Sequence, residues 1–134
     1  GEGEEYSSLK ELILKNKMQN NIFLLGFKKN IYNYLYFSSG LISSASYEDP
    51  GFTLIEAAFL KKNIISSLVK NGPKEMSLEG NVGFFYKYND EDDLLKKIKE
   101  CENSNDKLKN LNAIKLSKKY SIFNHSKQLA EYLI

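Results

Sequence analysis

The sequence predicts an α/β fold in which a parallel sheet carries helices on both faces. Short apolar segments rich in Ile, Leu and Phe alternate with segments of helical periodicity along the 134 residues. These short segments are continuous apolar runs, so we expect strands that are buried on both sides. Buried strands separated by helices are typical of a parallel sheet between two helical layers.

The first forty residues predict two helices and one strand. An acidic first turn followed by apolar residues at helical spacing indicates a helix from about Glu4 to Lys17. The apolar run Ile22–Gly26 is closed by glycine and predicts a buried strand. Asn30 is a residue type that caps helices, and the helix after it is expected to end near Gly40.

The middle of the chain continues the alternation. Leu41–Ser44 predicts a strand, and Tyr47–Gly51 a loop rich in turn-forming residues. Phe52–Leu60 is apolar on nearly every side, which indicates a largely buried helix. Asn63–Leu68 predicts the next strand. The sequence Asn71–Pro73 is expected to break the chain.

The remainder predicts one further strand and three helices. Val82–Tyr86 is the strand. The acidic run Asn89–Asp93 lies at the start of a helix with Lys residues further along, the charge order that the helix dipole favours. Two more helices are expected, from about Asp106 to Tyr120 and from about Phe123 to Leu133.

Composition excludes several classes of protein. An apolar content of 42% and a charged content of 27% indicate a globular domain. One cysteine, Cys101, and one histidine, His125, exclude a disulfide scaffold and a zinc site of the usual ligands. The net charge is only +2 and the chain has no Arg, so we expect no nucleic acid partner. No run of 18 apolar residues predicts a membrane span.

The segment from Ser44 to Phe59 carries the strongest functional signal. Ligands of such sheets bind beyond the carboxyl ends of strands, and Glu48 lies in a loop at that position. The next helix begins at Gly51, Phe52 and Thr53, whose unpaired N–H groups can hold an anion, while Glu56 follows one turn later. Carboxylates accept hydrogen bonds from vicinal diols, and a nucleotide sugar offers both a diphosphate and diols.

A purely structural interpretation of the same residues stays open. Thr53 and Glu56 have the spacing of a capping box, in which each side chain bonds to the backbone N–H of the other. Two glutamates eight positions apart also occur by chance in many proteins.

With its flanks, this segment resembles the Glu-x7-Glu (EX7E) motif of retaining glycosyltransferases with the two-Rossmann-domain GT-B fold, the large glycosyltransferase family 4 group. The match is Glu48, seven residues and Glu56, with Gly51 and Phe52 between them. Five flanking segments resemble the family in the same order: Asn21–Phe27, Asn63–Ser67, Gly72–Glu75, Gly83–Phe85 and Asp90–Ile98.

The resemblance implies a role for each of these residues. Glu48 would be the catalytic carboxylate at the donor sugar, and Glu56 would bind the ribose hydroxyls. The N–H groups of Gly51, Phe52 and Thr53 would face the diphosphate or the sugar. The implied reaction is retaining transfer of a hexose from a nucleotide-diphosphate sugar to a glycan or a lipid-linked acceptor, as in polysaccharide biosynthesis. It implies no catalytic metal and no cofactor besides the donor substrate.

The resemblance also implies that residues 1–134 form a single Rossmann-like, nucleotide-sugar-binding domain, the C-terminal part of a GT-B fold, truncated on its N-terminal side. We therefore expect the missing N-terminal domain as a partner and no transferase activity from the isolated chain. Ala45 replaces the Ser that the family often has three positions before the first Glu. The expected location is the cytoplasm, with peripheral association at the inner face of the membrane through the Lys surplus.

Two alternatives belong to other classes. One is a related two-Rossmann enzyme, a nucleotide-sugar epimerase that binds a similar donor. The other is a non-enzymatic α/β binding module in which Glu56 only caps a helix.

Overall fold

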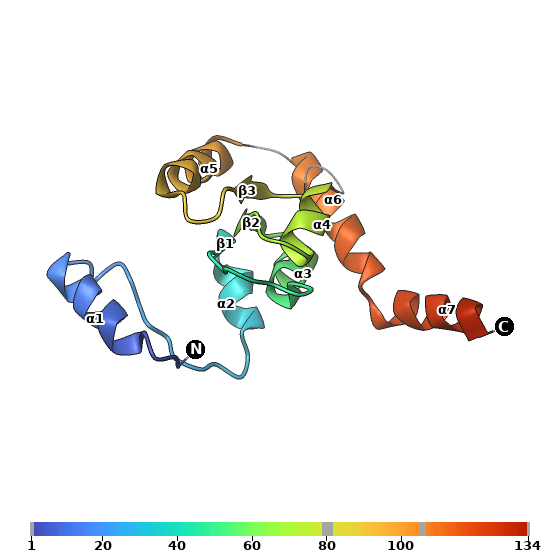
Figure 1. Ribbon diagram of the computed structural model, residues 1–134, viewed down its shortest axis with the longest axis horizontal. Helices are drawn as coiled ribbons and strands as arrows, with labels where there is room; N and C mark the ends of the chain where they lie inside the picture. Colours follow the sequence, from blue (N-terminus) through green and yellow to red (C-terminus); the bar gives the residue numbers. More distant parts are fainter. Residues whose placement is uncertain (1, 79–81, 105–106, 134) are drawn as a thin grey trace. The chain divides into compact units, whose positions relative to one another are not determined.

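The computed structural model describes residues 2–78, 82–104 and 107–133 (Figure 1). By their internal contacts they form two compact units, Gly1–Ile31 and Tyr32–Ile134. The assignment of the whole chain to one domain stays a prediction. Each unit is described by itself below.

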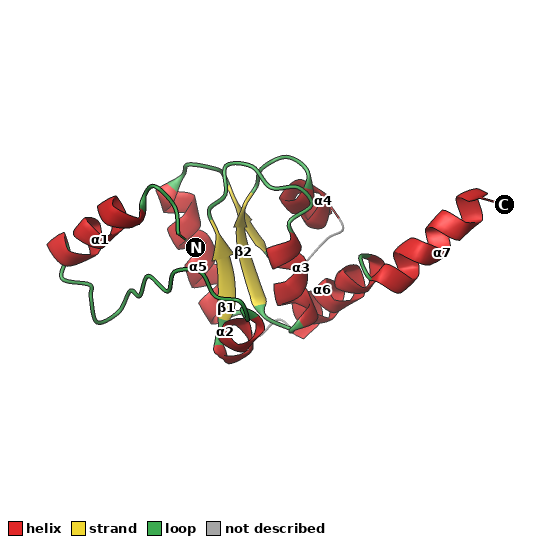
Figure 2. Cartoon of the chain, turned by 90° about the horizontal axis from the view of Figure 1, so that it is seen from below, coloured by secondary structure: helices red, strands yellow, loops and turns green. Residues whose placement is uncertain are grey.

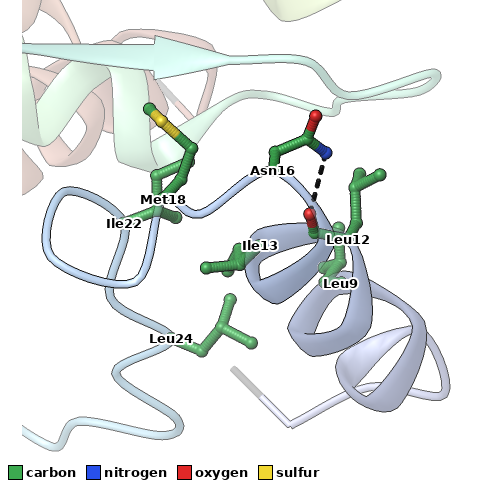
Figure 3. Close-up of a pocket in the computed structure, with 7 residues that line it drawn as sticks. All are labelled: Leu9, Leu12, Ile13, Asn16, Met18, Ile22 and Leu24. Atoms are coloured by element: carbon green, nitrogen blue, oxygen red, sulfur yellow. Dashed lines mark hydrogen bonds between the residues drawn. The ribbon is translucent and has the colours of Figure 1, made fainter.

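The first unit is built around α1, Tyr6–Lys15. This helix confirms the first predicted one, although it is two residues shorter at each end. Lys17 lies two residues beyond the end of the helix, and its φ of 55° is in the left-handed region. The N–H of Met18 donates to the Ile13 carbonyl and the N–H of Lys17 to that of Leu14, the bonding pattern of a Schellman C-cap. The chain then turns back, and an apolar groove of about 460 Å³ opens between the helix and the returning segment (Figure 3).

The strand predicted over Ile22–Gly26 is wrong. These residues have no strand partner among those that the structure describes, and Phe23 is 69% exposed. A strand exists only where a neighbouring chain accepts and donates its backbone hydrogen bonds. The apolar run indicates a tendency to be buried, but it does not specify a partner.

The second unit holds a parallel sheet of three strands in the order β1-β2-β3 (Figure 2). The strands are β1, Gly40–Ser43, β2, Asn63–Ser67, and β3, Phe84–Tyr86. Ile65 of β2 pairs with Ile42 on one side and with Phe84 on the other. The strands predicted at these three places are confirmed.

Helices cover both faces of this sheet, as predicted (Figure 2). On one face, Ile65, Phe84 and Tyr86 form a core with Cys101 of α5, Glu91–Asn103. On the other face lies α3, Phe52–Phe59, whose Leu54, Ala57 and Ala58 are fully buried. Ile64 and Ile65 are 1% and 6% exposed although their side chains point to opposite faces. The central strand β2 is therefore buried on both sides, whereas no residue of β1 is buried and its Ile42 is 52% exposed.

In the described part of the second unit, four further helices accompany α3 and α5. Among them, α6, Lys107–Lys119, packs on α3, while α7, Ile122–Leu133, follows α6. Residue 106, where the helix that corresponds to α6 was expected to start, lies outside the described residues. A short helix α2, Tyr32–Phe37, precedes β1. No helix in the described ranges is both long and apolar enough to cross a membrane.

One helix was not predicted. The expected chain break at Asn71–Pro73 is the start of α4, Gly72–Leu78. Asn71 has a φ of 66°, which turns the chain sharply after β2. Proline is tolerated in the first turn of a helix because the N–H that it lacks has no partner there. Pro73 therefore begins a helix instead of interrupting one.

Candidate functional site

The carboxyl ends of the three strands are joined by hydrogen bonds from their last residues. Ser67 Oγ at the end of β2 donates to the Ala45 carbonyl after β1, at 2.6 Å. The Tyr86 hydroxyl at the end of β3 donates to the Ser43 carbonyl at 3.3 Å, and burial raises the pKa of this phenol. These bonds fix the start of the loop that carries Glu48.

The far end of that loop is held against the start of α4. Glu48 forms an isolated parallel β-bridge with Asn71. Gly72 then approaches Pro50 so closely that a Cβ atom on Gly72 would lie 2.1 Å from the Pro50 carbonyl oxygen. The loop around Glu48 is therefore held by Asn71 and by Gly72 at the start of α4.

Gly51 places the Glu48 side chain over the start of α3. Gly51 is the N-cap residue of α3, with a φ of 84° in the left-handed region that favours glycine. A Cβ atom at Gly51 would lie 3.2 Å from Cγ of Glu48. A side chain at position 51 would therefore strain the backbone and push the Glu48 side chain away by a few tenths of an ångström, so the position favours glycine.

The first turn of α3 offers N–H groups that the fold does not use. The N–H groups of Leu54 and Ile55 donate to the Gly51 carbonyl at 3.0 and 3.1 Å. No hydrogen bond within the described ranges involves the N–H groups of Gly51, Phe52 or Thr53. They are donors for an anionic ligand at the positive end of a helix.

The capping-box interpretation of Thr53 and Glu56 is wrong. The N-cap residue is Gly51, and no side chain caps the helix. Thr53 is the second residue of α3, too far into the helix for its hydroxyl to act as an N-cap. Both side chains are therefore left for other partners.

Glu56 has a partner that the sequence did not indicate. The Tyr32 hydroxyl of α2 donates a hydrogen bond to Glu56 Oε1 at 3.0 Å. This bond and the nearby carboxylate charge raise the pKa of Tyr32. The residues are separated by 24 positions, so no local spacing could have revealed the pair.

The five predicted site residues thus share one segment at the carboxyl edge of β1. Glu48 lies beside the N-terminus of α3. Glu56 follows Thr53 by three positions, so these two residues lie on the same side of the helix. Neither carboxylate forms an ion pair in the described part of the chain. That part also holds no cluster of three or more His, Cys, Asp or Glu residues that could bind a metal ion. The segment combines N–H donors for an anion with two carboxylate acceptors for hydroxyl groups.

Comparison with known sequences identifies relatives. An uncharacterised glycosyltransferase of Methanocaldococcus jannaschii is 41% identical over 76 residues, which cover 57% of this chain and 19% of that protein. The poly(ribitol-phosphate) α-N-acetylglucosaminyltransferase of Staphylococcus aureus is 24% identical over 104 residues, which cover 78% of this chain and 21% of that protein. The chain thus spans about a fifth of the length of these relatives.

Solved structures share the fold. Anabaena HepE, solved with UDP-glucose, superposes with a TM-score of 0.80 at 22% identity, over 98% of this chain and 37% of HepE. A point mutant of Staphylococcus aureus TarM, solved with Fondaparinux, α-GlcNAc-glycerol and UDP, superposes with a TM-score of 0.70 at 23% identity. The superposition covers 89% of this chain and 23% of TarM. The sequence profile of the family described as "Glycosyl transferases group 1" matches residues 1–117. This chain therefore belongs to the group 1 glycosyltransferase family.

Proposed function

We propose that this chain supplies the donor-binding site of a retaining hexosyltransferase of the GT-B fold, within glycosyltransferase family 4. The observation that carries the proposal is the start of α3, where N–H groups without a partner among the described residues follow Glu48 and precede Glu56 in one segment at the carboxyl edge of the sheet. The ligand is a nucleotide-diphosphate sugar, because it has a diphosphate for the N–H groups and a diol for each carboxylate.

Each residue then has a defined task. The N–H groups of Gly51, Phe52 and Thr53 bind the diphosphate or the adjoining sugar oxygens. Glu56 accepts hydrogen bonds from the ribose hydroxyls. Glu48, held over Gly51, acts as the catalytic carboxylate at the donor sugar.

In the proposed reaction, the bond between the anomeric carbon and the β-phosphate oxygen breaks, and the acceptor hydroxyl oxygen bonds to that carbon. The hydroxyl proton passes to the leaving diphosphate. Negative charge grows on the diphosphate in the transition state, where fixed N–H groups and the helix dipole stabilise it. To retain the configuration at the anomeric carbon, the acceptor must attack the sugar ring from the same face as the departing diphosphate.

The acceptor and the cellular location belong to the same proposal. We expect a glycan or lipid-linked acceptor, bound together with an N-terminal domain of the whole protein, at the inner face of the membrane. The Lys surplus would favour contact with anionic lipid there. HepE and TarM were solved with UDP-glucose and with UDP, respectively, so UDP is the first nucleotide to test.

The experiment uses the full-length protein that contains this chain. Calorimetric titration with UDP should show affinity that falls about tenfold or more in Glu56→Ala, with little loss of thermal stability. Glu102→Ala, at an exposed glutamate near the end of α5, is the matched control and should bind UDP normally. Unchanged UDP affinity in Glu56→Ala would contradict the proposed ribose site.

Product analysis tests the reaction itself. The proton NMR coupling of the anomeric hydrogen should show the same configuration in the glycosylated product as in the donor. An inverted product would contradict the retaining mechanism. A free epimerised sugar nucleotide formed without any acceptor would favour the epimerase alternative.

A further inference from the structure

The hydrogen bond between Tyr32 and Glu56 connects α2 to α3 at the proposed donor site. Its donor and acceptor are 3.0 Å apart. Tyr32 is 51% exposed and Glu56 is half-buried, so the pair lies at the surface where a ligand can reach it. Tyr32 is outside the segment 48–56 and has no role in the proposed function above.

A second contact fixes α2 at its other end. Lys62, just beyond α3, directs its Nζ to the Tyr36 carbonyl and, at 3.0 Å, to the Ser38 carbonyl. A cation at these carbonyls stabilises the end of α2. The helix is therefore tied to the α3 region near its start through Tyr32 and near its end through Lys62, and the Tyr32 hydroxyl is held in place.

The bond leaves Glu56 able to bind a diol. An ionised carboxylate has about four acceptor positions, and one phenol hydroxyl occupies one of them. Two ribose hydroxyls can use positions that remain. Because the phenol restrains the carboxylate before the ligand arrives, less side-chain entropy is lost on binding.

The protonation state of Tyr32 supports this arrangement. Donation to Glu56 and the nearby carboxylate charge raise the pKa of Tyr32 above its ordinary value of 10.0. The hydroxyl therefore keeps its proton, and remains a donor, throughout the neutral range.

We propose that Tyr32 is a positioning residue that orients the Glu56 carboxylate toward the vicinal diol of the nucleotide ribose. The inference rests on the proposed function, since it assigns a support to the ribose-binding carboxylate. It predicts that Tyr32 contributes to affinity only when the ligand carries the diol.

The test compares two ligands and three variants of the full-length protein: Tyr32→Phe, Tyr34→Phe and Glu56→Ala. Tyr32→Phe keeps the ring and removes only the hydroxyl. Tyr34→Phe, an exposed tyrosine on the same helix, is the matched control. The ligands are UDP and 2′,3′-dideoxyuridine diphosphate, which lacks the diol. We expect Tyr32→Phe to weaken UDP binding about three- to tenfold and to leave binding of the dideoxy analogue unchanged.

The possible outcomes separate the two proposals. An equal loss for both ligands would assign Tyr32 a merely structural role, and no loss for either would remove it from the site. Glu56→Ala should abolish the preference for UDP over the analogue. If that preference survives in Glu56→Ala, the proposed ribose site itself fails. If it disappears in Glu56→Ala but is unchanged in Tyr32→Phe, only the positioning role fails.

Discussion

The backbone at Gly72 lies so close to Pro50 that a Cβ atom at position 72 would come within 2.1 Å of the Pro50 carbonyl oxygen. Real Cβ atoms essentially never approach another atom within 3.0 Å, so only glycine fits without movement of the backbone. Pro50 belongs to the loop that carries Glu48, and Gly72 is the first residue of α4. The contact therefore couples the position of α4 to the geometry of the site.

Gly72→Ala should lower the free energy of unfolding by about 1–3 kcal/mol, because two backbone segments must separate. Urea denaturation measures the loss. Gly3→Ala is the matched control, since a Cβ atom there would meet nothing within 4 Å. Equal stability of the two variants would show that the Pro50 loop yields without cost and that the contact does not position the site.

Lys61→Gly should stabilise the protein. Lys61 follows the end of α3 with a φ of 61°, and the N–H groups of Lys61 and Lys62 donate to the Ala58 and Ala57 carbonyls in a Schellman motif. A residue with a Cβ atom is strained in this conformation, so glycine should add roughly 0.5–1 kcal/mol to the free energy of unfolding.

The control for Lys61→Gly is the same substitution in a helix interior. Lys96 is exposed in the middle of α5, where glycine should remove about 0.5–1 kcal/mol. Chemical denaturation of the two variants should give shifts of opposite sign. Shifts of the same sign would refute the assignment of strain to Lys61.

Ionisation of the Cys101 thiol should lower the free energy of unfolding in alkaline solution. Burial raises the pKa of its thiol above the ordinary value of 9.0. As the pH rises past 9, the unfolded chain releases this proton while the native protein retains it, so the contribution of the thiol is complete below pH 9 and is lost above it. Tyr32 and Tyr86 have raised pKa values as well and add the same trend from about pH 10.

Urea denaturation between pH 8 and 10 measures this effect. The loss of stability with pH should be steeper in the parent protein than in Cys101→Ala, which lacks the titrating group. Identical slopes would mean that the thiol ionises equally well in the native and unfolded states.

Much of the fold could be predicted because it depends on local patterns. Asp90 illustrates this: the acidic run after β3 predicts a helix start, and the Asp90 side chain accepts a hydrogen bond from the Asp93 N–H. The strands β1, β2 and β3 were recognisable for the same reason, since each is a short apolar run between helices. Ile22–Gly26 has the same composition but no strand partner, and pairing is not encoded in a single segment.

In the candidate site, too, local relationships could be predicted from the sequence and long-range contacts could not. Glu48, Gly51 and Glu56 could be proposed as site residues because their spacing within one loop and one helix turn is local. Tyr32 could not be found, because its contact with Glu56 depends on how α2 packs beside α3. The closeness of Gly72 to Pro50 was likewise hidden, since a glycine before a proline indicates a turn as readily as the start of a helix.

The most direct test of the donor site is the turnover number of Glu48→Gln in the full-length protein, measured with the donor sugar that the product analysis identifies. We predict a fall of about a hundredfold or more, with UDP affinity within about threefold of the parent, because the proposed site puts Glu48 at the reacting sugar and not at the nucleotide. Glu102→Gln should retain normal turnover. Normal turnover in Glu48→Gln would contradict the assignment of the catalytic carboxylate.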